Sequence, residues 1–336
     1  MNTSPKVSFV VPCYNYGRYL EDCLSSIFNQ DLKEDFEVIV IDDASTDNTQ
    51  DVIKKFKSAN LIPIIHDKNM GHVISINKGL YAAKGDFIAR IDADDRYRSN
   101  FLSETLPIFY KNPEVGLVYG DPAIINEKGE ITLKKCNTHS NDFKKNVFID
   151  LLKKNFICAP TTIARKEAWQ EALPIPEGFN FSDWYLSLKM ARKFEFYYVD
   201  KIIADYRVHS NNWHSKITKD KSEEETILKI LNSFKDDFKE YRNEIYAAQY
   251  LDLANKYFGN YMDHDAKRCY LKAIRYKPGI LLNQSVARRL LGTLITRNNY
   301  EKLKSVLKKS VLGTFQTKGS LFFICLLNGL IMHHTS

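Results

Sequence analysis

The stretch "FIARIDADD" (residues 87–95) passes from an apolar run directly into three carboxylates within four positions. Its apolar part is typical of a buried β-strand. Asp92, Asp94 and Asp95 would repel one another and raise one another's pKa unless a positive group lay between them. Asp92 and Asp94, one residue apart at a strand end, can offer oxygen ligands to one hard cation such as Mg²⁺ or Mn²⁺. The alternative is a solvated turn that caps the next helix, and it applies most strongly to Asp95.

Three similar apolar runs precede this stretch, and each is followed by a polar cluster. The runs are "VSFVV" (7–11), "FEVIVI" (36–41) and "LIPIIH" (61–66), separated by segments with apolar residues at helical spacing. This alternation predicts a mostly parallel sheet with helices on both faces. Ligands of such sheets bind beyond the carboxyl ends of the strands. We therefore expect four clusters to converge at one edge: "PCYN" (12–15), "DDAS" (42–45), "HDKNMG" (66–71) and "DADD" (92–95).

The remainder of the chain divides into a mixed part and a helical part. Strand patterns continue through residues 115–121, a hairpin return through Gly129 (123–131), 156–165 and 194–209, with a helix over 182–193. From about residue 216 the pattern is helical only. Residues 247–278 weakly resemble one tetratricopeptide unit. Because about three repeats are needed for a stable array, we expect a helical extension rather than a solenoid.

Composition argues against several classes of protein. The 336 residues are 44% hydrophobic and 26% charged, which suits one or two globular domains. We find no run of about 20 apolar residues that could span a bilayer. The start, "MNTSPKVSFVV", lacks the pattern of a signal peptide. The six cysteines are scattered without a CxxC pair, so we expect a reduced, cytoplasmic protein without a disulfide scaffold or zinc site.

Positive charge is concentrated toward the C-terminal end. Residues 265–336 hold thirteen Lys or Arg and two acidic residues, a balance of +11, so the net charge of +7 leaves −4 for the rest of the chain. The asymmetry predicts an anionic partner. An anionic membrane surface fits, because "SLFFICLLNGLIM" (320–332) could bury side chains at the interface although it is too short to span. Packing of that segment onto the helices is the alternative. No aromatic-and-basic module is visible, so we expect no nucleic-acid partner.

Several residues in the polar clusters suit a nucleotide. The chain has neither GxxxxGK[ST] nor GxGxxG, which argues against an ATPase or a dinucleotide-dependent dehydrogenase. A bridging cation could neutralise a diphosphate without such a loop. Asp43 could accept a hydrogen bond from a base N–H, Tyr14 could stack on a base, and Pro12 would stiffen that loop. Helix capping by Asp43 and ordinary loop packing of the other two are the alternatives.

The chain resembles the family-two glycosyltransferases of the GT-A fold in four stretches that follow the family's order. They are "VSFVVPCYNYGRYLEDCLSSIFNQ", "VIVIDDASTDNT", "HDKNMGHVISINKGLYAAKGDFIARIDADD" and "FSDWYLSLKM", within roughly residues 5–210. The resemblance implies a nucleotide-sugar donor, usually a UDP-sugar, a divalent cation (Mn²⁺ or Mg²⁺) and inversion at the anomeric carbon. It also implies a GT-A domain over residues 1–215, with a nucleotide-binding half to about 105 and an acceptor half over 106–215, ahead of a helical extension over 216–336.

The resemblance also assigns roles to individual residues. Those that match the nucleotide-binding segments are Pro12, Tyr14, Asp43, Asn69, Gly71, Asn77, Asp92 and Ala93. In the DxD motif, Asp92 would face the ribose or the sugar and Asp94 would be the direct metal ligand, with His209 completing the metal site as in some members. Asp183 matches the second acid of the family's "ED" pair, the catalytic base. The alternatives are a helix N-terminal charge for Asp183 and a hydrogen-bonded surface residue for His209.

Two motifs depart from the family pattern. Ser182 stands where many members have the Glu of "ED". Where many members have "GxxxARN", this chain has "GHVISIN", with Ser75 and Ile76 in place of the Ala-Arg pair. A charged contact to the donor is then absent, which leaves the sugar open. His66 and His72 are expected to be loop residues.

The chemistry of the predicted site agrees with the resemblance. A carboxylate can take the proton of an attacking hydroxyl, the transition state resembles an oxocarbenium ion, and a cation can stabilise the departing diphosphate. We therefore expect an inverting hexosyl- or N-acetylhexosaminyltransferase that acts on a glycan or lipid-linked acceptor, cytoplasmic and peripheral on the inner face of the membrane. The alternatives are a catalytically inactive binding module, which the retained aspartates argue against, and a nucleotidyltransferase, which would have a glycine-rich turn after the first strand.

Overall fold

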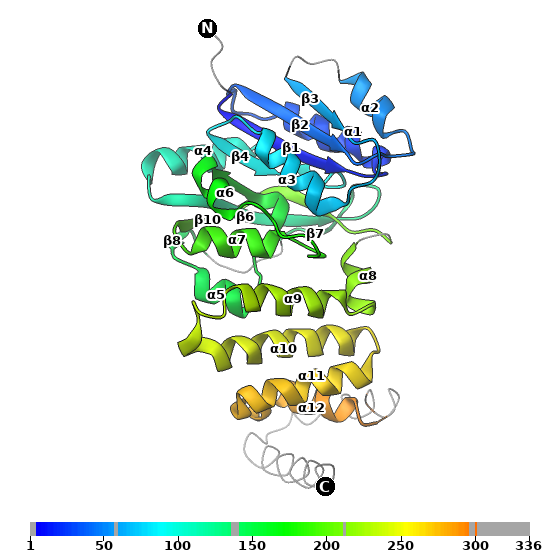
Figure 1. The fold of residues 1–336 in the computed structure, drawn as a ribbon, viewed down its shortest axis with the longest axis vertical. Helices are drawn as coiled ribbons and strands as arrows, with labels where there is room; N and C mark the ends of the chain where they lie inside the picture. Colours follow the sequence, from blue (N-terminus) through cyan, green and yellow to red (C-terminus); the bar gives the residue numbers. More distant parts are fainter. Residues whose placement is uncertain (1–4, 57–59, 136–140, 211–212, 296–299, 301–336) are drawn as a thin grey trace. The chain divides into compact units, whose positions relative to one another are not determined.

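The computed structural model describes residues 5–56, 60–135, 141–210, 213–295 and 300. The chain divides into two compact units, Met1–Leu151 with Asn155–Trp213, and Leu152–Lys154 with His214–Ser336. The first unit is α/β and the second is helical (Figure 1). The predicted fold class, a mostly parallel mixed sheet with flanking helices followed by a helical region, is confirmed.

The first unit is built on a sheet that has ten strands within the described residues. In chain order the strands are β1 (Val7–Cys13), β2 (Phe36–Asp42), β3 (Leu61–Ile65), β4 (Phe87–Arg90), β5 (Arg96–Tyr97), β6 (Val115–Ile125), β7 (Ile131–Leu133), β8 (Phe143–Lys145), β9 (Thr162–Arg165) and β10 (Glu195–Arg207). The order across the sheet is β3-β2-β1-β4-β9-β6-β10-β5, with β7 beside β6 and β8 beside β10. Strands β3, β2, β1 and β4 are parallel. Strand β9 runs antiparallel between β4 and β6, and β6 and β10 are again parallel.

Helices cover both faces of this sheet. They are α1 (Gly17–Phe28), α2 (Thr49–Lys55), α3 (His72–Ala82), α4 (Phe101–Lys111), α6 (Lys166–Ala172) and α7 (Asp183–Ala191). A further short helix, α5 (Phe148–Lys153), crosses the boundary between the two units in the sequence. All residues of β1 are buried, as expected for a strand covered on both sides. Its alternate residues Phe9 and Val11 join a core with the apolar faces of α1 and α4. On the other face, α3 lies so close that a Cβ at Gly79 would be 2.6 Å from Val10 Cγ1.

Two sequence predictions are corrected by the sheet. Residues 156–165 do not form one strand: a 3-10 turn (η1, Ala159–Thr161) precedes β9, which begins at Thr162. The turn is stabilised by Thr161 N and Oγ1, which both donate to Cys158 O. Residues 194–209 contribute one long strand, β10, rather than several. The hairpin return through Gly129 is confirmed, since its φ of +80° closes the turn between β6 and β7.

The second unit is helical throughout its described part. Its helices are α8 (Trp213–Lys219), which begins at the unit boundary, α9 (Ser222–Ser233), η2 (Lys239–Tyr241), α10 (Arg242–Gly259), α11 (Asp263–Tyr276), η3 (Pro278–Leu282) and α12 (Gln284–Gly292). Helices α10 and α11 form the predicted hairpin, and Pro278 follows its end. No helix in the described ranges is long and apolar enough to cross a membrane. The apolar segment 320–332 and much of the basic segment lie outside the described residues.

Buried ion pairs hold α9 against the hairpin. Glu224, 7% exposed, accepts hydrogen bonds from both terminal nitrogens of Arg268 and from Tyr257 Oη at 3.0 Å. Glu223 pairs with Lys256 at 2.5 Å and accepts from Thr218 Oγ1. Each carboxylate therefore has more than one donor, as buried charges require.

Candidate active site

The loops after the first three strands are joined through Asp43. Its backbone N–H donates to Cys13 O at 2.9 Å, which ties the end of β2 to the end of β1. Its Oδ1 accepts from Met70 N at 2.7 Å and lies 2.9 Å from His66 Nδ1, while Oδ2 accepts from Gly71 N at 2.9 Å. The predicted convergence of these clusters at one sheet edge is thus present.

Asp43 is held as a carboxylate by these contacts. Burial alone would raise its pKa, but the hydrogen bonds from His66 and from the N–H groups of Met70 and Gly71 hold the pKa of Asp43 below its usual value. The side chain is 3% exposed, so only the remaining lone-pair positions of its oxygens could receive a base N–H. The sequence suggested a nucleotide contact or a helix cap, and the structure adds a third role in closing the loop before α3.

The segment after β1 is arranged differently from the prediction. Pro12 is buried inside β1 opposite Ile41 of β2, not in the loop. The proline is tolerated there because the pairing of β1 with β4 has already ended at Val10. Tyr14 lies in the loop and is 44% exposed, which leaves its ring available for stacking.

Two residues at this edge have left-handed backbone conformations without being glycine. Asn15 has a φ of 56° and Ala44 a φ of 59°. Asn15 N donates to Ser45 Oγ, and its Oδ1 accepts from Thr46 N at 2.8 Å, so the loops after β1 and β2 fix each other. Strained residues of this kind gather at functional sites, where surrounding contacts hold them.

The two carboxylates of the DxD motif have separate partners. Asp92 Oδ2 lies 3.3 Å from Arg90 Nη2, and Asp94 Oδ2 lies 3.0 Å from His209 Nε2. The side chain of His209 is fully buried and packs against the rings of Tyr16 and Tyr19, with centroid distances of 5.8 and 5.3 Å. The structure therefore brings Asp94 and His209 together, as predicted, and directs Asp92 toward a residue that the sequence did not single out.

Asp95 contributes to the frame of the site, not to its open face. It is 1% exposed, and its Oδ1 accepts from Arg207 N at 2.8 Å. Burial, together with the charges of Asp94 and Asp92, raises its pKa well above the usual value. Of the two alternatives for this residue, a structural role therefore prevails, although the partner is the last strand and not the next helix.

Arg207, at the end of β10, holds the DxD turn in place. Its Nε donates to Asp94 O at 2.7 Å, and its Nη2 lies 3.1 Å from Asp22 Oδ2 of α1. Its Nη1 donates to Asn126 O and Glu127 O in the hairpin turn. The side chain is 1% exposed. A second positive charge beside the acid cluster thus comes from the opposite end of the unit's sequence.

The donors at Asp94 and His209 suit a divalent cation. Among the described residues, no group of three or more His, Cys, Asp or Glu is arranged to hold a metal ion. The two atoms Asp94 Oδ2 and His209 Nε2, however, are 3.0 Å apart. That is about the separation of adjacent octahedral ligands at about 2.1 Å from one ion. A carboxylate with an imidazole is a donor set that Mn²⁺ accepts, so this pair fits a cation whose other ligands come from phosphate and water.

Asp183 is the first residue of α7. Its carboxylate is partly exposed and its Oδ2 accepts from Asn155 Nδ2 at 3.2 Å. The start of a helix is a position at which a negative charge is favourable. Ser182, where the family has Glu, is 1% exposed and its hydroxyl has no hydrogen-bond partner among the described residues.

The predicted "NxG…N" segment also stabilises the local fold. Gly71, with a φ of +92°, allows the chain to turn into α3. Asn77 on that helix donates to Ile175 O at 3.0 Å and accepts from Ile175 N at 2.9 Å. Both ends of its amide are thus used to fix the segment that leads to Asp183. Asn69 is exposed in the loop, and Ala93 is buried within the DxD turn.

Three residues that sequence reasoning missed lie at the site. Arg90 and Arg207 supply the positive charge, and His72, at the start of α3, is close enough to Asp92 and Asp183 for electrostatic interaction. A buried-strand arginine two residues before the DxD motif is a signal that could have identified Arg90. For Arg207 and His72 only the folded chain reveals the neighbours.

Comparison with known proteins agrees with this geometry. The family model "Glycosyl transferase family 2" matches residues 8–173. The chain belongs to glycosyl transferase family 2. This family 2 glycosyltransferase is 27% identical over 221 residues to the putative teichuronic acid biosynthesis glycosyltransferase TuaG of Bacillus subtilis strain 168, covering 63% of this chain and 84% of TuaG.

Two solved structures share the fold of this family 2 glycosyltransferase. TarS residues 1–349 of S. aureus, in complex with UDP, superimposes with a TM-score of 0.55 at 18% identity and covers 93% of both chains. The mannosyltransferase PcManGT of Pyrobaculum calidifontis, in complex with GDP-Man and Mn²⁺, superimposes with a TM-score of 0.57 at 16% identity, covering 87% of this chain and 85% of that chain. At these identities the likeness concerns the fold.

Proposed function

We propose that this enzyme transfers a hexosyl or N-acetylhexosaminyl group from a UDP-sugar to a hydroxyl of a glycan or lipid-linked acceptor, with inversion. The observation that carries the proposal is the meeting of the Asp94–His209 pair with the ends of the first strands at one sheet edge. The complexes of TarS with UDP and of PcManGT with GDP-Man support a nucleotide-sugar donor. The relation to TuaG supports a glycan product.

Asp183 is the proposed general base. It would accept the proton of the acceptor hydroxyl as the hydroxyl oxygen bonds to the anomeric carbon. One base suffices for direct displacement, because the nucleoside diphosphate leaves as an anion without needing a proton from a second carboxylic acid. The helix start at Asp183 and the amide of Asn155 orient the carboxylate for this role.

Asp94 and His209 would hold a divalent cation, Mn²⁺ or Mg²⁺. The ion would supply charge neutralisation for the departing diphosphate. Asp92 would bind the ribose or sugar, while Arg90 restrains its carboxylate at 3.3 Å. Tyr14 and Asp43 would contact the base, and Asn69 and Gly71 would line the nucleotide. Pro12, Asn77 and Ala93 would act through their neighbours, since Pro12 and Ala93 are buried and the amide of Asn77 is bonded to Ile175.

A lipid-linked acceptor would give the basic C-terminal segment a function. The proposal keeps residues 265–336 as a peripheral anchor on an anionic cytoplasmic membrane surface, supported by their charge balance of +11. Flotation with anionic and neutral liposomes tests this. The full chain should float with anionic vesicles at low salt, and equal behaviour on both vesicle types would overturn the electrostatic anchor.

The proposed reaction is tested by incubating the protein with UDP-sugars and Mn²⁺ and identifying the released nucleotide. A transferase releases UDP in proportion to added acceptor. A nucleotidyltransferase acting on the same donor would transfer its uridylyl group and release the sugar 1-phosphate, and a binding module would release neither. Thermal stabilisation by UDP with Mn²⁺ but not by UDP with chelator would separately support the metal-dependent donor site, because a ligand of the native state raises its apparent stability.

A further inference from the structure

Arg90 has a buried nitrogen without a partner. The residue ends β4 and is 5% exposed. Its Nη2 is directed to Asp92 Oδ2 at 3.3 Å, whereas its Nη1 is buried and has no hydrogen-bond partner among the described residues. A charged N–H removed from water without an acceptor is unfavourable, so a buried arginine of this kind indicates a ligand that supplies the missing oxygen.

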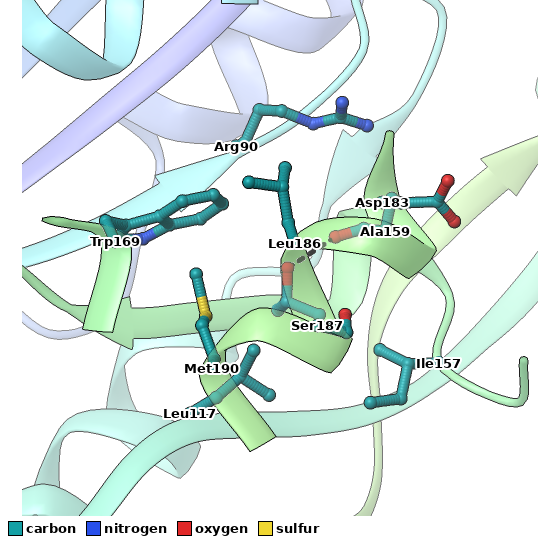
Figure 2. Close-up of a pocket in the computed structure, with 10 residues that line it drawn as sticks. Arg90, Leu117, Ile157, Ala159, Trp169, Asp183, Leu186, Ser187 and Met190 are labelled. Carbon is teal, nitrogen blue, oxygen red and sulfur yellow. Dashed lines mark hydrogen bonds between the residues drawn. The ribbon is translucent and has the colours of Figure 1, made fainter. Parts of the chain in front are cut away.

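A small pocket adjoins this arginine. Arg90 and Asp183 both line it, and Figure 2 shows their charged ends on the same side. The rest of the lining is mainly apolar and includes Leu117, Trp169, Leu186 and Met190. The polar end of Trp169 is already used, since its Nε1 donates to Ile88 O at 2.9 Å. The cavity measures about 20 Å³, which is room for a water molecule or a group about the size of a methyl.

The charges around the pocket argue for a neutral ligand group. Asp92 and Asp183 stand beside it, and Asp92 already occupies one side of the Arg90 guanidinium. A carboxylate on the ligand would meet these like charges and could not use both guanidinium nitrogens. A carbonyl oxygen needs only the one unpartnered nitrogen. An apolar group attached to that carbonyl would fit the side chains of Leu186 and Met190.

We propose that the pocket binds the acetamido group of the transferred sugar, and that the donor is therefore a nucleotide-linked N-acetylhexosamine. Arg90 Nη1 donates to the acetamido carbonyl oxygen, and the acetamido methyl group lies in the apolar part of the cavity. This inference rests on the proposed function, because it places the sugar between the DxD turn and Asp183. It makes Arg90 a specificity-determining residue.

Arg165 offers a matched control on the neighbouring strand β9. Its guanidinium is also largely enclosed, but its donors are satisfied by main-chain oxygens: Nε by Val115 O at 2.9 Å, and Nη2 by Phe109 O at 2.8 Å. Arg165→Lys therefore removes structural hydrogen bonds of the same kind without touching the pocket. Arg90→Lys keeps a positive charge near Asp92 but lacks the second nitrogen.

The experiment is a calorimetric titration of the full chain with UDP, UDP-glucose, UDP-N-acetylglucosamine and their galacto epimers, all with Mn²⁺. The wild type should bind the N-acetylated donor of one epimeric pair about tenfold more tightly than the matching hexose donor, a ratio typical of one buried hydrogen bond with an added methyl. Arg90→Lys should reduce this ratio to about one to two, because affinity for the N-acetylated donor falls more than affinity for UDP or for the hexose donor. Arg165→Lys should retain the wild-type ratio.

Three results would overturn the inference. Equal wild-type affinity for acetylated and plain hexose donors would mean that the pocket holds only water. An Arg90→Lys variant that retains the full ratio would mean that another residue recognises the sugar. A variant that loses affinity for UDP and both sugar nucleotides equally would mean that Arg90 only positions Asp92. If the wild-type protein binds no nucleotide, the proposed function itself is overturned, and not only this inference.

A donor series measured on the wild type alone keeps the inference testable if Arg90→Lys does not fold. Replacing the acetamido group by formamido removes the methyl but keeps the carbonyl oxygen. Replacing it by hydroxyl removes both. Affinity should fall in two steps, from acetamido to formamido to hydroxyl. A flat series would contradict the pocket assignment.

Discussion

The enzyme buries acidic side chains in two places, and the carboxylates of the two clusters have different partners. In the helical unit, Glu224 receives two nitrogens of Arg268 and the hydroxyl of Tyr257. In the α/β unit, Asp95 is even more buried, but its Oδ1 accepts from the main-chain N–H of Arg207 and the charges of Asp92 and Asp94 lie beside it. Glu224 is paired with a cationic side chain, whereas Asp95 accepts from a main-chain N–H and lies beside two like charges.

The pKa values follow the same division. Burial alone would raise the pKa of Glu224, but the hydrogen bonds from Arg268 and Tyr257 hold it below the usual value. For Asp95 burial and like charges act in the same direction and raise the pKa. The carboxylate of the scaffold pair is satisfied by its own partners, whereas crowded carboxylates with a raised pKa are typical of functional sites. The contrast therefore distinguishes scaffold from active site on electrostatic grounds.

Among the substitutions that compare the active site with the helical cluster, we expect Asp183→Asn to have the largest effect. Asparagine fills the same space but cannot accept the proton of the acceptor hydroxyl, so the transfer rate should fall by about 10² to 10⁴-fold. Donor affinity should stay close to the wild-type value, because Asp183 is not a proposed ligand of the cation held by Asp94 and His209. Rate measurements at saturating donor, with calorimetry of UDP binding as the control, check both points. Transfer at the wild-type rate would place the base elsewhere.

Asp94→Ala should remove the metal dependence of donor binding. We expect UDP affinity in the presence of Mn²⁺ to fall by about 100-fold, at least the cost of losing a residue that supports a metal ligand. UDP affinity with chelator present should be the same for variant and wild type. Paired calorimetric titrations with and without Mn²⁺ measure this. The assignment of Asp94 is wrong if Mn²⁺ improves UDP binding equally in both proteins.

Glu224→Gln tests whether the acidic cluster of the helical unit contributes to stability alone. Removal of the charge leaves Arg268 without its bidentate partner and should cost about 2 kcal/mol of stability, below the usual range for a broken buried pair because Arg268 is 33% exposed. Urea unfolding measures the change, while UDP binding should not alter. The matched control is Lys239→Ala, which breaks an exposed pair with Asp236 and should leave stability unchanged. Equal effects of both variants would contradict the special role of the buried pair.

The smallest expected effect is a change in acid sensitivity. Because the folded-state pKa of Glu224 is lowered, its contribution to stability is complete above its unfolded value near 4.5 and is lost as the pH falls through the folded-state pKa. The stability difference between wild type and Glu224→Gln should therefore be constant from pH 7 to about 5.5 and shrink below about 4.5. Urea unfolding at a series of pH values tests the sign. A difference that grows on acidification would be inconsistent with a lowered pKa.

The sequence predicted those parts of the fold that depend on local patterns. Strands β1, β2 and β4 were predictable because continuous apolar runs are typical of strands buried on both faces. The α10–α11 hairpin was predictable from its helical spacing. Residues 156–165 were not, since their β-rich composition conceals a turn that Thr161 makes with Cys158. The bounds of the domain prediction remain a proposal.

The candidate site was predictable in its acids and not in its cations. Asp92, Asp94 and Asp183 belong to recognisable motifs. The partner of Asp92, Arg90, is only two residues away, but other contacts at the site join distant segments. The contact of Asp43 with Gly71 spans 28 residues, and that of Asp94 with His209 spans 115. No spacing rule encodes such pairs, because they depend on how strands are ordered in the sheet. The second function of Asn77, through Ile175, is hidden for the same reason.

Arg207 has a consequence for how the protein is made. The ribosome releases the chain from its N-terminal end, and segments begin to fold as they emerge. Arg207 contacts Tyr19, Asp22 and Asp94. All three of these residues leave the ribosome long before Arg207 does. A nascent chain that stops before residue 207 can pair β1, β2 and β4 but lacks the side chain that anchors its DxD turn. Activity in this enzyme should therefore be acquired late in synthesis, after most of the sheet already exists.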